Sequence, residues 1–439
     1  MATSHESLWS TAVRLRGNPR AAVWTEPMWG LSMALVLPYA SVYMLALGLS
    51  DQQIGLLATI GILSQTVFGL LGGVITDKLG RRATTAVFDL VAWSVPCLIW
   101  AVAQNFWFFL GASLVNGAWQ VTQNSWDCLL VEDAEPRLIT RVYSLVRVAA
   151  DLSALFAPVA AVLVARFGLE PAVRILYVNA FVVMTAKVWI LYRASHETDV
   201  GRLRMTQVAG RSTWSLLREY RGVGAVIRRS PGTLYSVAVM AVVAAVALVT
   251  GTFWQIAVSQ RLGVPDALLP FFPMARSILS MLFFFTLIPR LTGGAQLRRP
   301  TRWGFVAYLA GQLLLVAIPA ADGARTSTYL LLGVTLVLDG FGGGILAMLA
   351  ESLVALHVDK LERSRVMAMQ RTAVMLVTAP FGWIAGWLSG VDRSWPFVLT
   401  SSLLVLGLVL TGWAPTLPQH DVDEPPLPVP PGPETARGM

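Results

Sequence analysis

The side chains best suited to chemistry in this sequence are a few ionisable groups inside long apolar stretches. Glu26, Asp151 and Asp339 are acids of this kind, and Arg276 is a base. Asp151, Arg276 and Asp339 each lie about ten residues from the nearer end of their stretch. Loss of water around a carboxyl group favours its neutral form, which suits such an acid to accept and release a proton.

Asp339 is the first candidate for a proton carrier. It precedes a glycine-rich and therefore flexible segment, Gly340-Phe341-Gly342-Gly343-Gly344. Glu26 is the second candidate and Asp151 the third. The chemistry predicted from these residues is proton uptake and release within an apolar environment.

A second group of polar side chains lies on one face of a predicted helix. The members of this face are Asn116, Gln120, Gln123, Asn124 and Asp127, and Trp119 and Trp126 flank them. Their spacing of four, three, one and three residues places them on one side of a helix. Amides and aromatic rings suit a neutral or amphipathic organic solute better than an inorganic ion. The alternative is that the amides form hydrogen bonds between helices.

The sequence offers no pattern for a metal, a cofactor or an enzyme. Its 4 histidines lie outside the apolar stretches, and no cluster of His, Cys and acids has the spacing of metal ligands. No glycine-rich phosphate loop follows a strand. We therefore expect no enzyme, no metal and no cofactor, with a proton or another ion as the coupling species.

Membrane-spanning helices must position these side chains. Of the 439 residues, 55% are hydrophobic and only 13% are charged, which excludes a soluble protein. A spanning helix needs about 20 apolar residues. Such stretches lie at 22–47, 54–76, 83–104, 106–130, 141–165, 171–192, 232–259, 267–288, 303–321, 328–350, 365–388 and 395–413. The predicted fold class is an all-α polytopic membrane protein with twelve transmembrane helices.

Basic residues are distributed unequally between the two sides of this array. Of the 33 lysines and arginines, 24 lie on the side of the termini and four lie in loops on the other side. This bias predicts cytoplasmic N- and C-termini. The net charge of +8 then reflects orientation, and no nucleic-acid partner is needed. We expect a monomer in the cell membrane of a bacterium, with the lipid bilayer and a small-molecule substrate as partners.

The twelve stretches form two related sets of six. The segment 47–51 recurs as 262–266, and an acid followed by two arginines recurs with the same spacing. The two copies of that second pattern are Asp127, Arg141 and Arg147, and Glu351, Arg365 and Arg371. The chain is therefore predicted to be a duplicated six-helix unit.

Four regions follow from this duplication. Residues 1–193 and 232–413 are the two six-helix bundles, and 194–231 is a cytoplasmic linker. Within the linker, apolar residues at helical spacing over 214–227 predict an amphipathic helix on the inner leaflet. The alternative is a solvated linker rich in arginine. Residues 414–439 are rich in proline and predict a disordered cytoplasmic tail.

The loop between the second and third stretches reads G-V-I-T-D-K-L-G-R-R over residues 73–82. Gly73 permits close approach of a neighbouring helix, Gly80 permits a tight turn, and Asp77 is an anion that can sit at a helix N-terminus. This run resembles the signature motif of the major facilitator superfamily. The twelve stretches, the duplication and the long central loop extend the resemblance over nearly the whole chain.

This resemblance implies two pseudo-symmetric six-helix bundles that move a solute by alternating access, with the site near mid-membrane between the repeats. It also implies that Asp77 holds the second helix against the eleventh while the carrier faces outward. Lys78, Arg81 and Arg82 would belong to the same charge network.

In this family the first, fourth, seventh and tenth helices line the central cavity. The resemblance therefore adds four further residues to the expected substrate site, Trp29, Tyr39, Trp254 and Gln255. The fifth and eighth helices are neighbours in the same fold. Asp151 and Arg276 could accordingly form a structural ion pair instead of serving transport.

The repeated acids and arginines have a family parallel in cytoplasmic charge clusters that join the two halves. We predict that Asp127, Arg147, Glu351 and Arg371 form an inner gate that breaks when the carrier opens inward. The alternative is static pairing within each half.

The direction of transport depends on the fifth helix, where antiporters of this superfamily carry a glycine-rich motif. Here the small residues Ser144, Ser153, Ala157 and Ala161 stand in place of its glycines, except the last, which is Val162. This favours proton-coupled efflux by antiport. The alternatives are proton-coupled uptake by symport, facilitated diffusion of a sugar-like or other polar metabolite, and a non-transporting sensor on the same fold.

Overall fold

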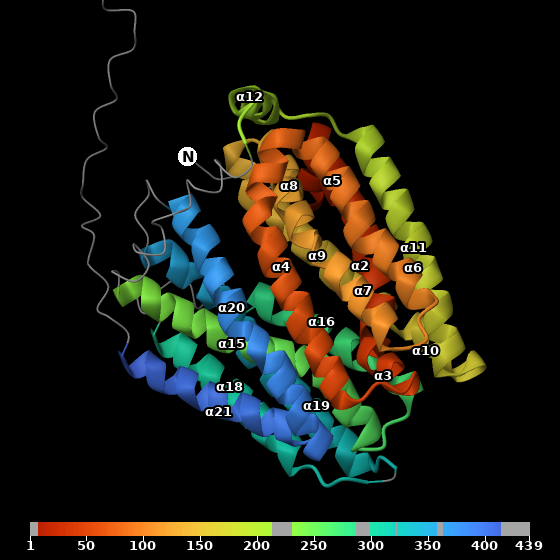
Figure 1. Cartoon of the computed structure of the whole chain (residues 1–439). Coiled ribbons are helices and arrows are strands. Elements are labelled where there is room, and N and C mark those ends of the chain that lie inside the picture. The colour runs from red at the N-terminus through yellow and green to blue at the C-terminus, as the bar shows by residue number, and fades with distance from the viewer. Residues whose placement is uncertain (1–7, 213–230, 287–297, 322, 358–362, 414–439) are drawn as a thin grey trace, which may run out of the picture.

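The computed structural model describes residues 8–212, 231–286, 298–321, 323–357 and 363–413. Within these ranges every regular element is helical, as Figure 1 shows. The amphipathic helix predicted over 214–227 and the proline-rich tail at 414–439 lie outside the described residues.

The first half of the chain forms six helical columns, most of them divided into shorter helices. In chain order they are α2 (Gly17–Val36), η1 (Leu37–Tyr39) and α3 (Ala40–Ala46); α4 (Asp51–Leu79); α5 (Arg81–Asp89), η2 (Leu90–Ser94) and α6 (Val95–Ala101); α7 (Phe106–Asn116) and α8 (Trp119–Val131); η3 (Pro136–Leu138), α9 (Ile139–Ser153), η4 (Ala154–Phe156) and α10 (Pro158–Phe167); and α11 (Leu169–Ala194). The short helix α1 (Leu8–Arg14) precedes them, and α12 (Asp199–Val208) follows.

The second half is built from longer, less divided helices. They are α15 (Pro231–Gln260), η5 (Asp266–Leu268), α16 (Phe271–Thr286), α18 (Arg298–Ala317), α19 (Thr326–His357), α20 (Arg363–Val391), α21 (Trp395–Leu410) and η6 (Thr411–Trp413). Their positions match the six apolar stretches predicted for this half.

Ten segments of the described chain are long and apolar enough to cross a membrane, which confirms the predicted fold class. The two other predicted spans, 106–130 and 303–321, correspond to the α7–α8 pair and to α18. The α7–α8 column is interrupted at Gly117, where a Cβ would lie only 2.1 Å from Ser64 Oγ of α4. Helix α18 begins with Arg298, Arg299 and Arg302, which make its first turns polar.

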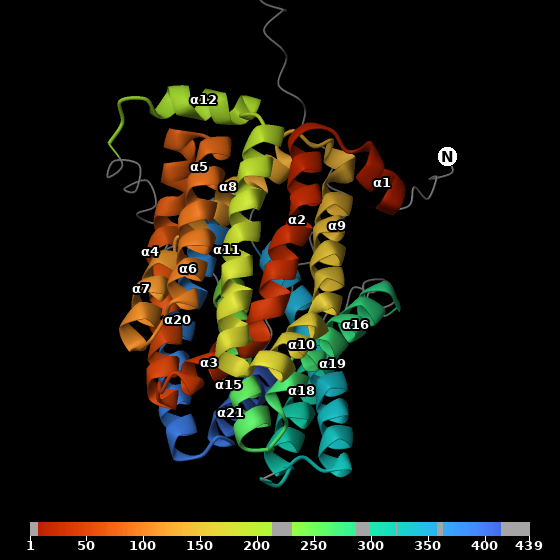
Figure 2. The same ribbon diagram turned by 90° about the vertical axis from the view of Figure 1, so that its right-hand side faces the viewer.

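The two halves lie against each other along α4 and α20, which run side by side in Figure 1. Glycines permit this approach, because a Cβ on Gly55 would lie 2.4 Å from Gly382 O and 2.7 Å from Gly386 Cα. Figure 2 shows α16 beside α9, and α16 also contacts η4, so this is a second region where the halves meet.

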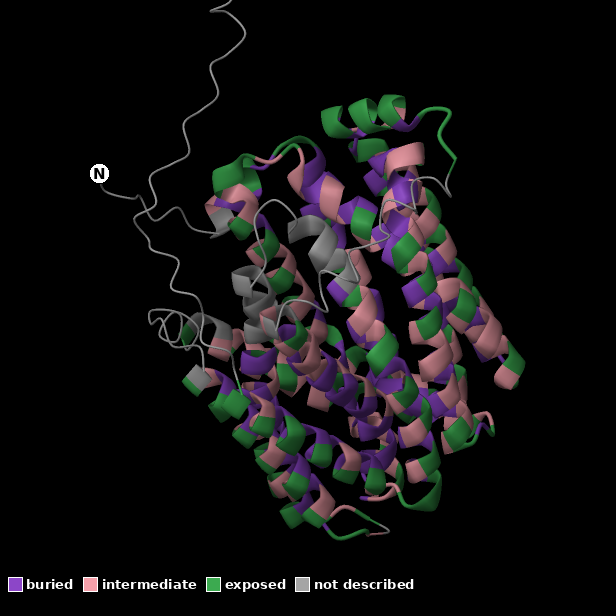
Figure 3. Ribbon diagram, turned by 60° about the vertical axis from the view of Figure 1, so that its left-hand side comes forward, coloured by how far each residue is buried: buried purple, intermediate pink, exposed green. Residues whose placement is uncertain are grey.

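The outward faces of the helices carry large apolar side chains, and exposed residues follow the outer sides of the columns in Figure 3. Trp107, Trp189 and Trp303 are each more than 60% exposed. A soluble protein would not expose so much apolar surface, whereas a helix bundle surrounded by lipid does. The polar side chains discussed below lie inside this apolar shell.

Candidate functional site

A cavity of about 1000 Å³ lies between the two halves. Nine of the residues predicted to face a substrate or carry a proton line it. They are Glu26, Trp29, Asn116, Trp119, Gln123, Trp254, Gln255, Arg276 and Asp339. Residues from both halves therefore meet at one site, as the predicted duplication requires.

Three predicted substrate residues do not line this cavity. Tyr39 is fully buried in the hydrophobic core, at the end of the 3-10 turn η1, which follows α2 and contains Pro38. Gln120 is buried beside α4, and Asn124 Nδ2 donates to Thr76 Oγ1 at 3.2 Å. In this structure these three side chains are packed between helices and do not border the cavity.

The amides of α7 and α8 serve two purposes. Asn116 lines the cavity, yet its Nδ2 donates to the Ala92 carbonyl at 2.8 Å, within the π-helical turn η2. Gln123 also lines the cavity and donates to the Asp127 carboxylate at 3.0 and 3.1 Å. Hydrogen bonding between helices, the alternative explanation of the polar face, therefore accounts for Asn124 and part of the role of Asn116.

Aromatic rings form much of the cavity wall. Trp93 stands between Trp29 and Trp119, with ring centroids 5.6 Å and 6.3 Å away. Trp254 packs edge-on against Phe272 at 5.0 Å in the other half. Sequence reasoning missed Trp93 and Phe272, together with Trp100, Phe109 and Tyr177. Their helix faces could not be assigned from apolar runs that have no polar side.

Asp339 is only 3% exposed and lies at the cavity surface on α19. Its Oδ2 accepts a 3.0 Å hydrogen bond from Gln312 Nε2, and Thr400 Oγ1 donates to Gln312 Oε1 at 2.9 Å. Gly311 leaves room for this carboxylate, since a Cβ there would lie 2.2 Å from Asp339 Oδ1. Arg276 interacts with Asp339 electrostatically.

Asp151 has a different partner from the one considered above. In the described part of the chain its carboxylate pairs at 3.0 Å with Arg147, one turn earlier on α9, and not with Arg276. Side chains four residues apart on one helix are neighbours, so Arg147 is closer to Asp151 than a cation on another helix. Arg147 Nη2 also donates to Ser280 Oγ of α16 at 2.8 Å, which joins the two halves.

A buried ionic cluster in the first half was not predicted. Lys187 Nζ of α11 lies 2.9 Å from Asp89 Oδ2 of α5, and both residues line the cavity. Glu26 of α2, also buried, interacts electrostatically with both. Their position inside predicted spans was the signal that could have identified Asp89 and Lys187.

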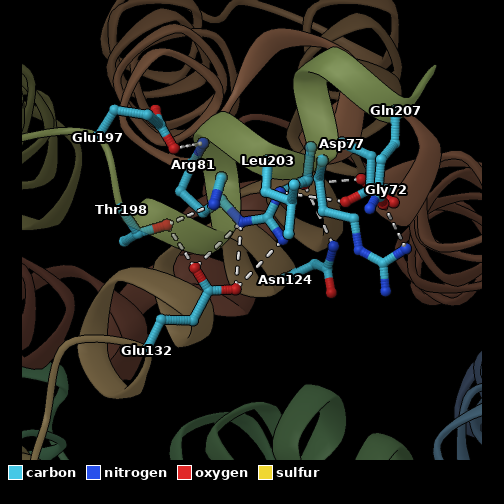
Figure 4. Close-up of polar contacts among 12 residues, drawn as sticks. Gly72, Asp77, Arg81, Asn124, Glu132, Glu197, Thr198, Leu203 and Gln207 are labelled. Carbon is cyan, nitrogen blue, oxygen red and sulfur yellow. Dashed lines mark hydrogen bonds and ion pairs between the residues drawn. The ribbon is translucent and has the colours of Figure 1, made fainter. Parts of the chain in front are cut away.

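The signature loop is organised around Arg81, as Figure 4 shows. Its guanidinium contacts Asp77 Oδ1 at 3.1 Å and the Glu132 carboxylate at 3.2 Å. The Glu197 carboxylate accepts from the main-chain N–H groups of Arg81 and Arg82 at 2.8 and 3.0 Å, which satisfies the free N-terminus of α5.

This loop is also attached to the start of the linker. Thr198 Oγ1 donates to Glu132 and accepts from the Gly201 N–H, and so caps α12. Arg82 donates to the Tyr192 carbonyl at 2.7 Å. Gly80 has a φ of +83° at the turn, as its predicted role requires. Lys78 lies in the last turn of α4.

Gly72 of α4, the residue before Gly73 of the signature run, faces a neighbouring helix. A Cβ on Gly72 would lie 3.4 Å from the Gln120 carbonyl of α8. The sequence motif had drawn attention to the next position, Gly73. The close approach of a neighbouring helix at Gly73 stays a prediction.

The predicted inner gate has not formed one cluster in the described structure. Asp127 is held by Gln123, and Arg371 is exposed and interacts with Asp127 electrostatically. Arg147 pairs with Asp151, and the side chain of Glu351 lies outside the description. The inner gate therefore stays a prediction.

The halves are instead closed at the far end of α4, away from the signature loop. Ser389 Oγ of α20 donates to Asp51 Oδ1 at 2.7 Å, and Arg393 lies 3.8 Å from the same carboxylate. Thr59 Oγ1 donates to the Ala379 carbonyl at 2.7 Å and accepts from the Trp383 N–H at 2.8 Å. We call these contacts, with Gly55, Gly382 and Gly386, the α4–α20 seam.

Comparison with solved structures places this architecture among known transporters. The nucleoside transporter NupG aligns with a TM-score of 0.70 at 14% identity, covering 90% of this chain and 98% of that one. The peptide transporter POT in complex with alafosfalin aligns with a TM-score of 0.70 at 15% identity, covering 94% and 99%. At these identities the likeness shows the fold alone.

Among curated relatives, the Quinolone resistance protein NorA of Staphylococcus aureus is 33% identical over 87 residues. That match covers 20% of this chain and spans 22% of the length of the relative. The family model described as Major Facilitator Superfamily matches residues 28–332, well over half of the chain. The resemblance of the signature run is thereby confirmed, and the chain belongs to the Major Facilitator Superfamily.

Proposed function

We propose that the protein is a secondary active transporter that exports a small organic solute by alternating access, in exchange for protons. The observation that carries this proposal is the cavity between the halves. Both halves contribute aromatic rings and buried ionisable groups to it. A cavity of about 1000 Å³ matches the upper range of sites for drug-sized molecules.

Asp339 is the residue proposed to carry the proton. It lies inside the α19 span, is almost fully buried, and borders the cavity. Among the described residues no cation lies within ion-pair distance of it, and Gln312 supplies its hydrogen bond. An acid in this environment can change its protonation state when the cavity changes its exposure to water.

Export is the proposed direction. The partial match to a quinolone resistance protein supports an exported organic compound. The small residue Ser153 of α9 packs closely against Gly30 of α2. A Cβ on Gly30 would lie only 2.7 Å from Ser153 Oγ, so position 153 keeps the close packing that the glycine motif would give. We place the protein as a monomer in a bacterial cell membrane with both termini in the cytoplasm.

The test uses inverted membrane vesicles, in which export appears as uptake into the vesicle. With an acidic interior, an aromatic fluorescent dye from a panel of candidates should accumulate, and a protonophore should abolish the accumulation. Asp339→Asn should remove gradient-driven accumulation and leave downhill exchange of the dye. Asp392→Asn, at an acid in a loop beyond α20, is the control and should leave accumulation unchanged.

Three results would replace this proposal. Accumulation only with the opposite gradient would indicate symport. Movement indifferent to any gradient would indicate facilitated diffusion. Binding of solutes with no movement at all would indicate a sensor on this fold.

A further inference from the structure

Three ionisable side chains from three helices meet in the first half of the cavity. Lys187 and Asp89 form a 2.9 Å ion pair in which the side chains are 5% and 3% exposed. Glu26, 8% exposed, adds a second carboxylate that interacts with both partners. All three residues line the cavity, so the cluster faces whatever the cavity holds.

The ionisable side chains that line the cavity give its two walls different net charges, as far as the described residues show. When ionised, Glu26 and Asp89 outnumber Lys187, which leaves one net negative charge on the first-half wall. Asp127 lies behind this wall and also interacts with Glu26. On the second-half wall, the charges of Arg276 and Asp339 cancel when Asp339 is ionised, and protonation of Asp339 makes that wall positive. Charges count for more inside a protein than in water, so this difference creates a negative pole on one side of the cavity.

An unused hydrogen-bond acceptor lies at this pole. Asp89 Oδ2 is bound to Lys187, whereas the buried Oδ1 has no hydrogen-bond partner among the described residues. Gln255 Oε1 and Asp339 Oδ1, on the opposite wall, are buried and unpartnered in the same way. A ligand that donates hydrogen bonds would relieve the cost of leaving such groups unpaired.

Indole rings stand beside both acids. Trp29 follows Glu26 by three residues on α2, and Trp93 follows Asp89 by four, so each ring shares a helix face with an acid. The two rings contact each other at 5.6 Å with an interplanar angle of 79°. Trp119 closes the same wall from α8. Indoles next to carboxylates favour an organic cation through cation–π attraction.

We propose that Glu26 and Asp89, with the indoles of Trp29, Trp93 and Trp119, bind the charged group of an aromatic ammonium solute. Lys187, which is ion-paired with Asp89, offsets one of the two carboxylate charges, so that this wall carries one net negative charge. This inference rests on the proposed function, because it identifies the substrate class of the same cavity. It adds Asp89 and Lys187 as residues that determine charge selectivity.

The test compares three ligands with one aromatic body and different charges: 1-naphthylmethylamine, 1-naphthalenemethanol and 1-naphthaleneacetate. Binding to the purified full chain in nanodiscs is measured by equilibrium dialysis, with empty nanodiscs subtracted. The amine should bind at least roughly tenfold more tightly than the alcohol, and the acetate least tightly. Equal affinity for amine and alcohol, or preference for the acetate, would overturn the proposal.

A series of variants then separates charge from structure. Glu26→Gln and Asp89→Asn each remove the net negative charge and should weaken amine binding on the order of tenfold. Lys187→Gln doubles the charge and should strengthen it. The double variant Asp89→Asn/Lys187→Gln restores one negative charge and should return affinity to within about threefold of the original. Binding of the neutral alcohol should stay constant throughout.

If Lys187→Gln does not fold, the remaining variants still decide the matter. Glu26 has no ion pair among the described residues, so Glu26→Gln removes charge without breaking one. The proposed charge selectivity would be refuted if the double variant bound the amine more weakly than Asp89→Asn alone. It would also be refuted if the affinity for the alcohol fell in parallel with that for the amine, because these residues would then have a structural role.

The two proposals fail separately, because binding is measured at equilibrium with no gradient. Gradient-driven transport with no preference for the amine would remove the cation pole and leave the transporter. An affinity series that follows charge, in a protein that moves no solute, would keep the pole and remove the transport function.

Discussion

Arg81 illustrates how one side chain can organise a whole loop. Its guanidinium is 5% exposed and contacts Asp77 and Glu132, while its main-chain N–H group holds Glu197. Three chain segments therefore meet at Arg81: the end of α4, the end of α8 and the start of the linker before α12. Without it, two carboxylates would be left without their cation.

We expect Arg81→Gln to lower the free energy of unfolding by about 2 kcal/mol, less than the loss of a fully buried pair, because Asp77 and Glu132 are 34% and 14% exposed. Thermal unfolding of the purified protein, followed by tryptophan fluorescence, measures this loss. Arg137→Gln is the control, because Arg137 pairs with Glu135 on the surface with an 81% exposed side chain. Equal losses in the two variants would contradict the central role of Arg81.

Sequence alone predicted these residues unevenly. Asp77, Gly80 and Arg81 were singled out because the signature run fixes their spacing. Asp339 was singled out because an acid inside a membrane-spanning stretch is energetically costly and is therefore a functional candidate. The pairing of Asp89 with Lys187 could not be found in the same way. Partners from different helices far apart in the chain become neighbours only through packing, which no local pattern reports.

At the scale of elements, the α4–α20 seam depends on the absence of side chains. A Cβ on Gly386 would lie 2.7 Å from the Asp51 carbonyl and 2.8 Å from Gly55 Cα. Backbone at this distance cannot give way as a flexible side chain can. The separation of the two helices is therefore set by glycine.

Gly386→Ala should force the seam apart and favour opening at that end. An introduced cysteine at Ile54, which is 1% exposed and borders the cavity, should then react faster with a membrane-impermeant thiol reagent added on the side of the seam. Gly61→Ala, on the facing helix α4, is the control, since a Cβ there meets nothing within 4 Å. Unchanged reactivity in Gly386→Ala would show that the seam tolerates the methyl group.

The positions of the helices were predictable and their interruptions were not. Apolar length alone located the spans, because a bilayer demands it. The 3-10 turn at Pro38 and the π-helical turn over Leu90–Ser94 rotate the residues that follow them. Tyr39 and Trp93 lie within these turns, so regular helical spacing does not give the faces on which their side chains lie.

At the scale of the whole molecule, the halves are joined by Asp51 with Ser389 and Arg393 at one end, and by Arg147 with Ser280 beside α9. Alternating access requires the first of these contacts to break when the cavity opens on the seam side. The structure shows that side closed.

Cross-linking the seam should therefore stop transport. In the variant Asp51→Cys/Ser389→Cys, a short thiol-reactive cross-linker should block solute movement in vesicles, and reductive cleavage of the linker should restore it. Each single-cysteine variant treated in the same way should keep its activity. Full transport in the cross-linked double variant would mean that the seam does not open during the cycle.

The attachment of Glu197 and Thr198 to the signature loop also sets the length of the tether between the two halves. Because Glu197 and Thr198 are bound to Arg81 and Glu132, the part of the chain that is held against the first half extends through α12 to Val208, and the second half begins at Pro231. Roughly 22 residues have a contour length on the order of 70 Å. Among the described residues, the two halves are joined by packing of α4 against α20 and of α16 against α9, so these packed helices set the geometry of any rocking between the halves.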